Sequence, residues 1–78
     1  MSMESLEKLR ILLPHWIEHN KSHEAEYSKW AAVIRNEGNS EVSEHIEKAI
    51  VSLRQADAAL NEALGKVGGP LKDDHHHH

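Results

Sequence analysis

Three histidines lie four residues apart in one stretch of the chain, and they are its main candidates for chemistry. They are His15, His19 and His23, in the run HWIEHNKSH. Imidazole nitrogen is a good ligand for nickel, copper and zinc. Side chains four residues apart lie on the same face of an α-helix. If this segment is helical, the spacing therefore predicts a row of metal ligands.

The row is longer than one metal ion can span. On a straight helix His15 and His23 are separated by about 12 Å of rise, whereas an imidazole–metal bond is about 2.1 Å long. Two neighbours could share one ion, but all three hardly could. We expect a pair from one copy, completed by a third histidine from a second copy. If the helices of two copies cross antiparallel near His19, His23 of one meets His15 of the other. The alternative interpretation is that all three are solvated surface residues.

Two helices must position these histidines. Apolar residues recur at alternating steps of three and four, which predicts one helix over about residues 4–36 and a second over about residues 41–67. Gly38 suits the left-handed end of the first helix, and Ser40 suits the N-cap of the second. Gly68-Gly69-Pro70 should end the second helix, since proline cannot continue it.

The predicted contact between the helices is a heptad seam. In the first helix the seam residues are Leu6, Leu9, Leu13, Trp16, Asn20, His23, Tyr27, Trp30 and Ile34. In the second helix they are Ile46, Ala49, Leu53, Ala56, Leu60, Ala63 and Val67, with Val42, Ile50 and Leu64 widening the seam. Because the recurring alanines leave a smooth surface, we expect Trp16 and Trp30 to pack against it. Pro14 removes one backbone N–H, so we expect the first helix to be kinked.

The short loop between the helices predicts an all-α fold, an antiparallel two-helix hairpin. We expect the hairpin to occupy residues 1–69 and a disordered, histidine-containing tail to occupy residues 70–78. A hairpin of this size leaves much of its apolar surface in water. We therefore expect a homodimer, either a four-helix arrangement or a coiled coil of two hairpins.

Composition excludes several kinds of protein. The 78 residues include no cysteine, which excludes disulfides and thiolate metal sites. The formal charge of -4 argues against a nucleic-acid partner, which would call for a basic surface. No apolar run approaches the roughly 20 residues that cross a bilayer. We therefore expect a soluble, cytoplasmic protein without a membrane partner.

Other ionisable residues have two interpretations each. Glu18 and Glu24 are candidates to orient the imidazole rings from a second shell, or else are solvent-facing charges. His45, early in the second helix, is expected on the surface near the level of residues 31–32, away from His19. The run His75–His78 is either an affinity tag or a native tail that gathers divalent metals.

The histidine run resembles a motif of a known family, the CooJ nickel chaperones linked to maturation of carbon monoxide dehydrogenase. That family carries H-W-x2-H-x3-H, and the four defined residues are met here by His15, Trp16, His19 and His23. The flanking sequences are also similar, so that the resemblance extends over about residues 6–71.

This resemblance implies a homodimeric helical hairpin that is not an enzyme and that holds Ni²⁺ at its dimer contact through the motif histidines. It also implies a nickel-storing C-terminal tail, which favours the native interpretation of His75–His78, although tails in that family can be longer and richer in histidine. The implied partners are a client nickel enzyme, carbon monoxide dehydrogenase, or its maturation ATPase. The alternative function is a dimeric coiled-coil interaction module in which the histidines are incidental.

Overall fold

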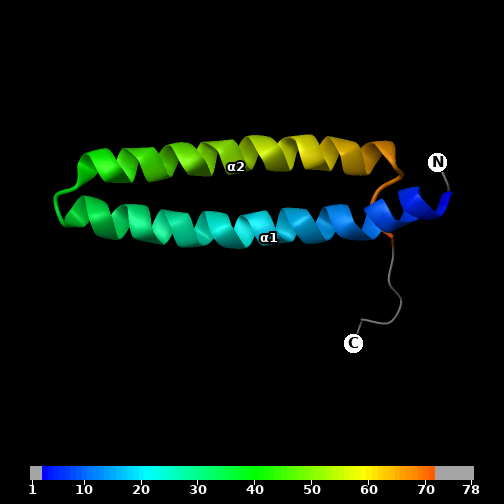
Figure 1. Cartoon of the computed structure of the whole chain (residues 1–78), viewed down its shortest axis with the longest axis horizontal. Helices are drawn as coiled ribbons and strands as arrows, with labels where there is room; N and C mark the ends of the chain where they lie inside the picture. Colours follow the sequence, from blue (N-terminus) through cyan, green and yellow to red (C-terminus); the bar gives the residue numbers. More distant parts are fainter. Residues whose placement is uncertain (1–2, 72–78) are drawn as a thin grey trace, which may run out of the picture.

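The chain folds into two long helices that lie side by side and run antiparallel (Figure 1). The computed structural model describes residues 3–71. Helix α1 spans Met3–Asn36 and helix α2 spans Ser40–Lys66. The predicted all-α hairpin is confirmed, with every helix end within one residue of its predicted position. His75–His78 lie outside the described residues.

Gly38 follows the end of α1 and allows the chain to reverse its direction. Gly38 has a φ of 93°, in the left-handed region that a residue without a Cβ adopts at little cost. The N–H of Gly38 donates to the carbonyl of Arg35, and the N–H of Asn39 donates to that of Ile34, both at 3.0 Å. Asn39, rather than the predicted Ser40, is the N-cap residue of α2, and Ser40 is its first helical residue.

The contact between the helices is a continuous seam of buried and half-buried residues. In α1 they are Leu13, Ile17, Asn20, Glu24, Tyr27, Ala31 and Ile34. In α2 they are Ser43, Ile46, Ile50, Leu53, Asp57, Leu60, Leu64 and Val67. Both rows step by three and four residues, as the heptad pattern predicts. The best-buried apolar cluster lies at the open end of the hairpin, around Leu13, Ile17 and Leu64.

The predicted seam of α1 alternates between two rows of residues, and the row that contains Trp16, His23 and Trp30 is wrong. Trp16 and Trp30 are 42% and 47% exposed, whereas the next residues along the chain, Ile17 and Ala31, are 7% and 3% exposed. The same shift occurs in α2, where the three alanines at 49, 56 and 63 are exposed. Steps of three and four occur in both candidate rows, so periodicity alone cannot distinguish them.

Two polar contacts show why the shifted row is the buried one. Near the loop, the fully buried Ser43 hydroxyl donates to the carbonyl of Ala31 at 2.8 Å. Such close approach needs small side chains, and an indole does not fit there. Farther along, the amide of Asn20 donates to Asp57 Oδ1 at 2.9 Å. Because a slip in register would leave these polar groups unpaired, the two contacts fix how α1 and α2 align.

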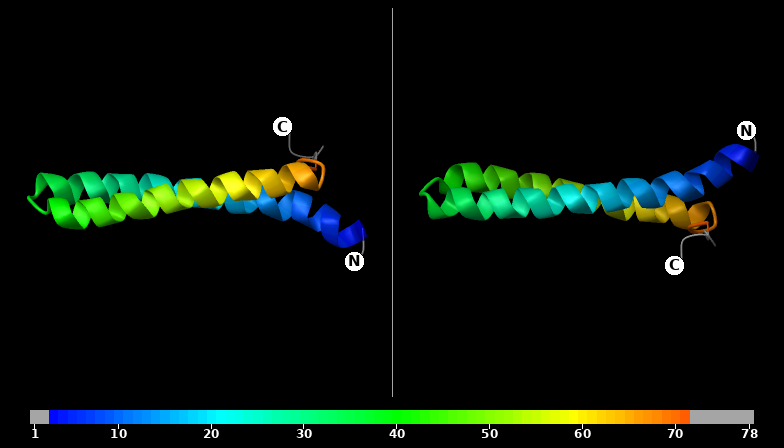
Figure 2. Two further views of the ribbon diagram at one scale, coloured as in Figure 1. Left: turned by 90° about the horizontal axis from the view of Figure 1, so that it is seen from above. Right: turned by 90° about the horizontal axis from the view of Figure 1, so that it is seen from below.

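The open end of the hairpin is held together by Arg10. Its Nε donates to the carbonyl of Gly69 at 2.7 Å, and its backbone carbonyl accepts from the N–H of Leu71 at 3.3 Å. Leu71, within the predicted tail, is thus still attached to α1. Pro14 lies inside α1, and the first turns of the helix bend away from α2 (Figure 2). This agrees with the predicted kink, since a proline in a helix interior pushes apart the preceding turn. Within residues 3–71 neither helix is long and apolar enough to cross a membrane.

Candidate metal centre

The three predicted ligands project from successive turns in the middle of α1, and all three are exposed. The ring centroids of His15 and His19 are 6.4 Å apart, with ring planes at 26°. Those of His19 and His23 are only 4.5 Å apart, edge to face at 87°. The structure therefore brings His19 and His23 together and leaves His15 one step away.

The two adjacent imidazoles point the same nitrogen at each other. His19 Nε2 and His23 Nε2 lie 3.0 Å apart, within hydrogen-bond distance. In a neutral imidazole one nitrogen donates and the other accepts, so this contact needs a different tautomer in each ring. Two nitrogen lone pairs can converge at this point once the donating ring carries its proton on Nδ1 instead of Nε2.

The row of rings continues toward the hairpin loop. The Tyr27 ring stacks beside His23, with centroids 6.0 Å apart and planes at 26°. Within residues 3–71 no three His, Asp or Glu side chains gather closely enough to hold one metal ion. In that part of the chain, the His19–His23 pair is the convergent set of imidazoles.

Two carboxylates near the histidines, those of Glu24 and Glu26, are engaged elsewhere. Glu24, a candidate to orient an imidazole, instead accepts a hydrogen bond from Arg54 Nε at 2.8 Å across the hairpin. Glu26 accepts from the indole N–H of Trp30 at 3.0 Å. Glu18, the other candidate, is exposed. The rings are therefore positioned mainly by the helix and by one another.

Asn20 fixes the rotation of α1 at the level of the histidines. It directly follows His19, and its amide is hydrogen-bonded to Asp57, which is 8% exposed. His19 and His23 are both exposed, whereas Asn20 and Glu24 are half-buried against α2, so the two histidines lie to one side of the seam. The prediction that His23 belongs to the seam is therefore wrong, and the half-buried Glu24 takes that position.

His23 belongs to a row of residues along the flank of α1, which we call the outer strip. It consists of Leu9, Trp16, His23 and Trp30, which recur every seven residues. Leu9 is half-buried, and the other three are exposed. The outer strip therefore places a metal ligand in line with two large aromatic side chains.

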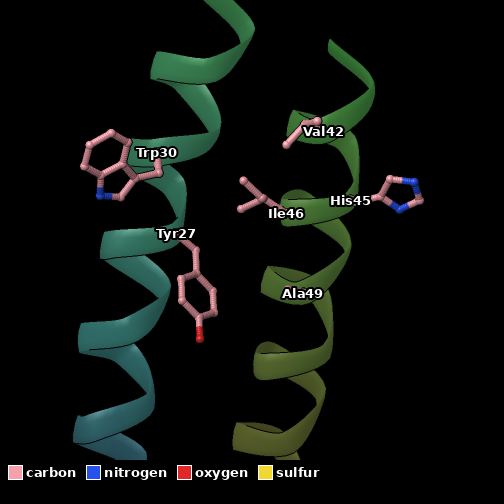
Figure 3. Close-up of a pocket in the computed structure, with 6 residues that line it drawn as sticks. All are labelled: Tyr27, Trp30, Val42, His45, Ile46 and Ala49. Atoms are coloured by element: carbon pink, nitrogen blue, oxygen red, sulfur yellow. The ribbon is translucent and has the colours of Figure 1, made fainter. Parts of the chain in front are cut away.

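Sequence reasoning missed a groove beside the outer strip, close to the loop (Figure 3). Its volume is about 480 Å³, and its lining residues are Tyr27, Trp30, Val42, His45, Ile46 and Ala49. Val42 and Ala49 recur at seven residues on α2, as the outer strip does on α1. This shared period was a sequence signal for the groove. It was missed because Val42 and Ala49 were assigned to the seam between the two helices.

His45 stands where the sequence predicts. It is exposed, and it follows by two residues Ser43, which contacts Ala31. Twelve residues separate Ala31 from His19, or about 18 Å of helix. The imidazole of His45 also points away from Trp30 in Figure 3. His45 is thus remote from the His19–His23 pair.

Comparison with known proteins places the chain in a family. The family described as "Domain of unknown function (DUF8180)" matches residues 9–67, a range that includes most of α1, all of α2 and the histidine row. An uncharacterized protein of Archaeoglobus fulgidus is 32% identical over 63 residues, which cover 81% of this chain and all of the relative. No solved structure matches the chain. The chain therefore belongs to the DUF8180 family.

Proposed function

We propose that this protein is a nickel metallochaperone: it binds Ni²⁺ through His15, His19 and His23 at the contact between two copies and delivers the ion to an apo-metalloenzyme. The observation that supports this proposal best is the 3.0 Å separation of the His19 and His23 Nε2 atoms. The resemblance of the motif to the CooJ family supplies the expected client, carbon monoxide dehydrogenase. Carriage of a metal breaks no bond in a substrate, so the protein is not proposed as an enzyme.

The separation of the two nitrogens is compatible with both belonging to one metal ion. With a nitrogen–metal bond of about 2.1 Å, two ligands at a right angle lie about 3.0 Å apart, and two tetrahedral ligands about 3.4 Å apart. The 3.0 Å contact of the exposed His19 and His23 rings is that of an ordinary hydrogen bond, and small rotations of the rings reach either geometry. The pair therefore supports a shared ion, and the choice of Ni²⁺ comes from the resemblance of the motif rather than from this distance.

The third ligand is proposed to come from a second copy. His15 is displaced along α1, with its ring centroid 6.4 Å from that of His19. Its distance from His23 is about 12 Å of helix rise, too great for both to bind one ion. If two α1 helices cross antiparallel at His19, a two-fold axis places His15 of one copy beside His23 of the other. Two symmetric sites would then join the copies.

The surface around the histidines supports such a contact. Exposed large apolar side chains that line up on one face of a small protein mark an interaction surface. Trp16 and Trp30 are 42% and 47% exposed on the outer strip, on either side of His23. A second copy placed over this strip would remove both indoles from water and shield the metal from solvent.

Imidazole ligands suit a protein that must release its metal. They bind only in the neutral form, so protons compete with the ion. Affinity alone would favour Cu²⁺ over Ni²⁺ at a site of nitrogen ligands. Nickel loading in the cell would therefore depend on the geometry of the completed site and on metal supply.

The alternative function, a dimeric coiled-coil interaction module, is favoured by the same exposed tryptophans without any role for the histidines. Calorimetric titration with Ni²⁺ separates the two. We would use the full chain with His75–His78 changed to alanine, so that the tail histidines do not contribute. We expect His19→Ala to weaken binding by about 100-fold or more, since even loss of a second-shell partner costs roughly 10–100-fold.

The matched control is His45→Ala, which also removes one helical histidine but lies remote from the pair. We expect it to leave nickel affinity unchanged. If the tail-substituted chain binds no nickel, or if His45→Ala and His19→Ala weaken binding equally, the chaperone proposal is overturned. Sedimentation of the same proteins then tests whether the interaction module remains as a dimer.

A further inference from the structure

The groove between α1 and α2 near the loop is a surface that one copy leaves uncovered. Its volume is about 480 Å³. Tyr27 and Trp30 border it from α1, and Val42 and Ile46 from α2 (Figure 3). Trp30 is 47% exposed and Val42 is 50% exposed. Groups of this kind favour an apolar occupant over a charged one.

Leu12 of α1 is a second uncovered apolar side chain. It is 40% exposed, although its neighbour Leu13 is among the best-buried residues. Leu9, one turn earlier, packs instead against the Leu13, Ile17 and Leu64 cluster of its own hairpin. Leu12 precedes His19 by seven residues. Leu12 therefore lies on the flank of α1 that carries the proposed metal ligands.

The spacing of the histidines aligns these two surfaces across a dimer. In a two-fold crossing at His19, His15 of one copy lies level with His23 of the other. By the same count, Leu12 of one copy lies level with Glu26 of the other. That is the level of the groove, which begins at Tyr27 and Trp30.

We infer that the groove of each copy is occupied by Leu12 of the second copy's α1. The inference rests on the proposed function for its register, since the His15–His23 contact sets which residues meet. It goes further by assigning an occupant to the groove of each copy. Two such contacts, one at each end of the crossing, would orient the helices that hold the metal.

The absence of cysteine from the chain allows a direct test. We would introduce Leu12→Cys and Ala49→Cys together and oxidise the protein without nickel. A disulfide requires Cα atoms within about 7 Å. In one copy Leu12 and Ala49 lie at different levels of the hairpin, about 22 Å apart along the helix axis. A bond between these two positions must therefore join two copies.

We expect the Leu12→Cys, Ala49→Cys protein to form a covalent dimer, with mass spectrometry finding the bond between these two positions. The matched control is Leu12→Cys with Val51→Cys, because Val51 is 51% exposed but lines a different surface, with Ser28 and Arg54. Circular dichroism of the reduced proteins establishes that both are helical. Equal cross-linking of the two variants would overturn the inference.

Failure of this inference can be told apart from failure of the proposed function. If the chain binds nickel through His19 and sediments as a dimer but the Leu12–Ala49 bond does not form, the register is different and only the inference fails. If the bond forms and no nickel binds, the inference stands and the chaperone proposal fails. A groove that instead takes a client protein would leave the chain monomeric and un-cross-linked, which also overturns it.

Discussion

Two neighbouring rows of α1 differ by one residue step, and the chain uses them in opposite ways. The inner row, which faces α2, contains Ile17 and Ala31, at 7% and 3% exposure. On the outer strip Trp16 and Trp30 remain 42% and 47% exposed, with His23 between them. The hairpin is thus closed by small and aliphatic residues, and its largest side chains are left for another surface. This division indicates that folding of one copy and contact with another depend on different residues.

The sharpest way to test this division is to truncate two adjacent leucines. Leu13 is 4% exposed in the seam and Leu12 is 40% exposed on the other flank. We expect Leu13→Ala to lower the free energy of unfolding by about 2–5 kcal/mol, the usual cost of removing a buried leucine side chain. Leu12→Ala should lower it far less at protein concentrations where the chain is monomeric. Urea denaturation at several protein concentrations measures both.

If the two alanine variants are equally destabilised in the monomer, the distinction between an inner row and an outer strip has no energetic basis. If instead the effect of Leu12→Ala grows with protein concentration, the residue contributes through association. The Leu13→Ala effect should be present at every concentration.

Acidification should affect the outer strip and spare the hairpin. An ordinary imidazole is protonated below about pH 6.5 and must be neutral to bind a metal. Because each imidazole ligand must lose its proton to bind, nickel affinity should fall as the pH is lowered from about 7.5 to about 5.5. Affinity must fall rather than rise on acidification, because protons bind the imidazoles only in the metal-free protein. Calorimetry across this range measures the loss, and circular dichroism should show unchanged helix content.

A pH-independent affinity would mean that carboxylates, rather than histidines, hold the nickel. The single-ligand variant His19→Ala sharpens the result. Its weaker binding should depend less steeply on pH, because one fewer imidazole takes up a proton.

The Asn20–Asp57 pair in the seam should contribute more to the free energy of unfolding than any surface charge. Asp57→Ala leaves the amide of Asn20 without its 2.9 Å partner in a half-buried position. An unsatisfied polar group of this kind costs about 1–3 kcal/mol. We expect urea denaturation to show a loss in this range. The double variant Asn20→Leu, Asp57→Leu should recover it, since an apolar pair leaves nothing unsatisfied. A double variant as unstable as Asp57→Ala would show that the Asn20–Asp57 hydrogen bond itself stabilises the fold, and does more than leave neither polar group unpaired.

The sequence predicted the helices, the loop and the hairpin, because these depend on local signals. The three–four periodicity, Gly38 and the Gly68-Gly69-Pro70 break are each read from a few neighbouring residues. The choice between the two candidate rows of α1 depends on contacts between the helices. Ser43 of α2 lies against the carbonyl of Ala31 in α1, so the row that contains Ala31 and Ile17, rather than the row of the tryptophans, faces α2. Periodicity does not encode this contact.

The candidate site was predicted in part for the same reason. Four-residue spacing was enough to expect that two of the three histidines converge, but not which two. The structure pairs His19 with His23 at 3.0 Å and leaves His15 apart. Ring orientation on a helix depends on side-chain rotamers, which sequence spacing does not specify. The groove at Trp30 was missed because it exists only where two helices meet.

The smallest expected effect concerns the seam position next to His23. Glu24 is half-buried there, and its carboxylate meets Arg54 at 2.8 Å, with side-chain exposures of 22% and 64%. The mostly exposed guanidinium is screened by water, so Arg54→Ala should lower the free energy of unfolding by only about 0.2–1 kcal/mol. Added salt should shrink the difference further. A loss well above this range would mean that Glu24 behaves as a buried charge left unpaired. Water would then be excluded from the inner row at the level of His23. The inner row and the outer strip would differ more in solvation than their exposed fractions indicate.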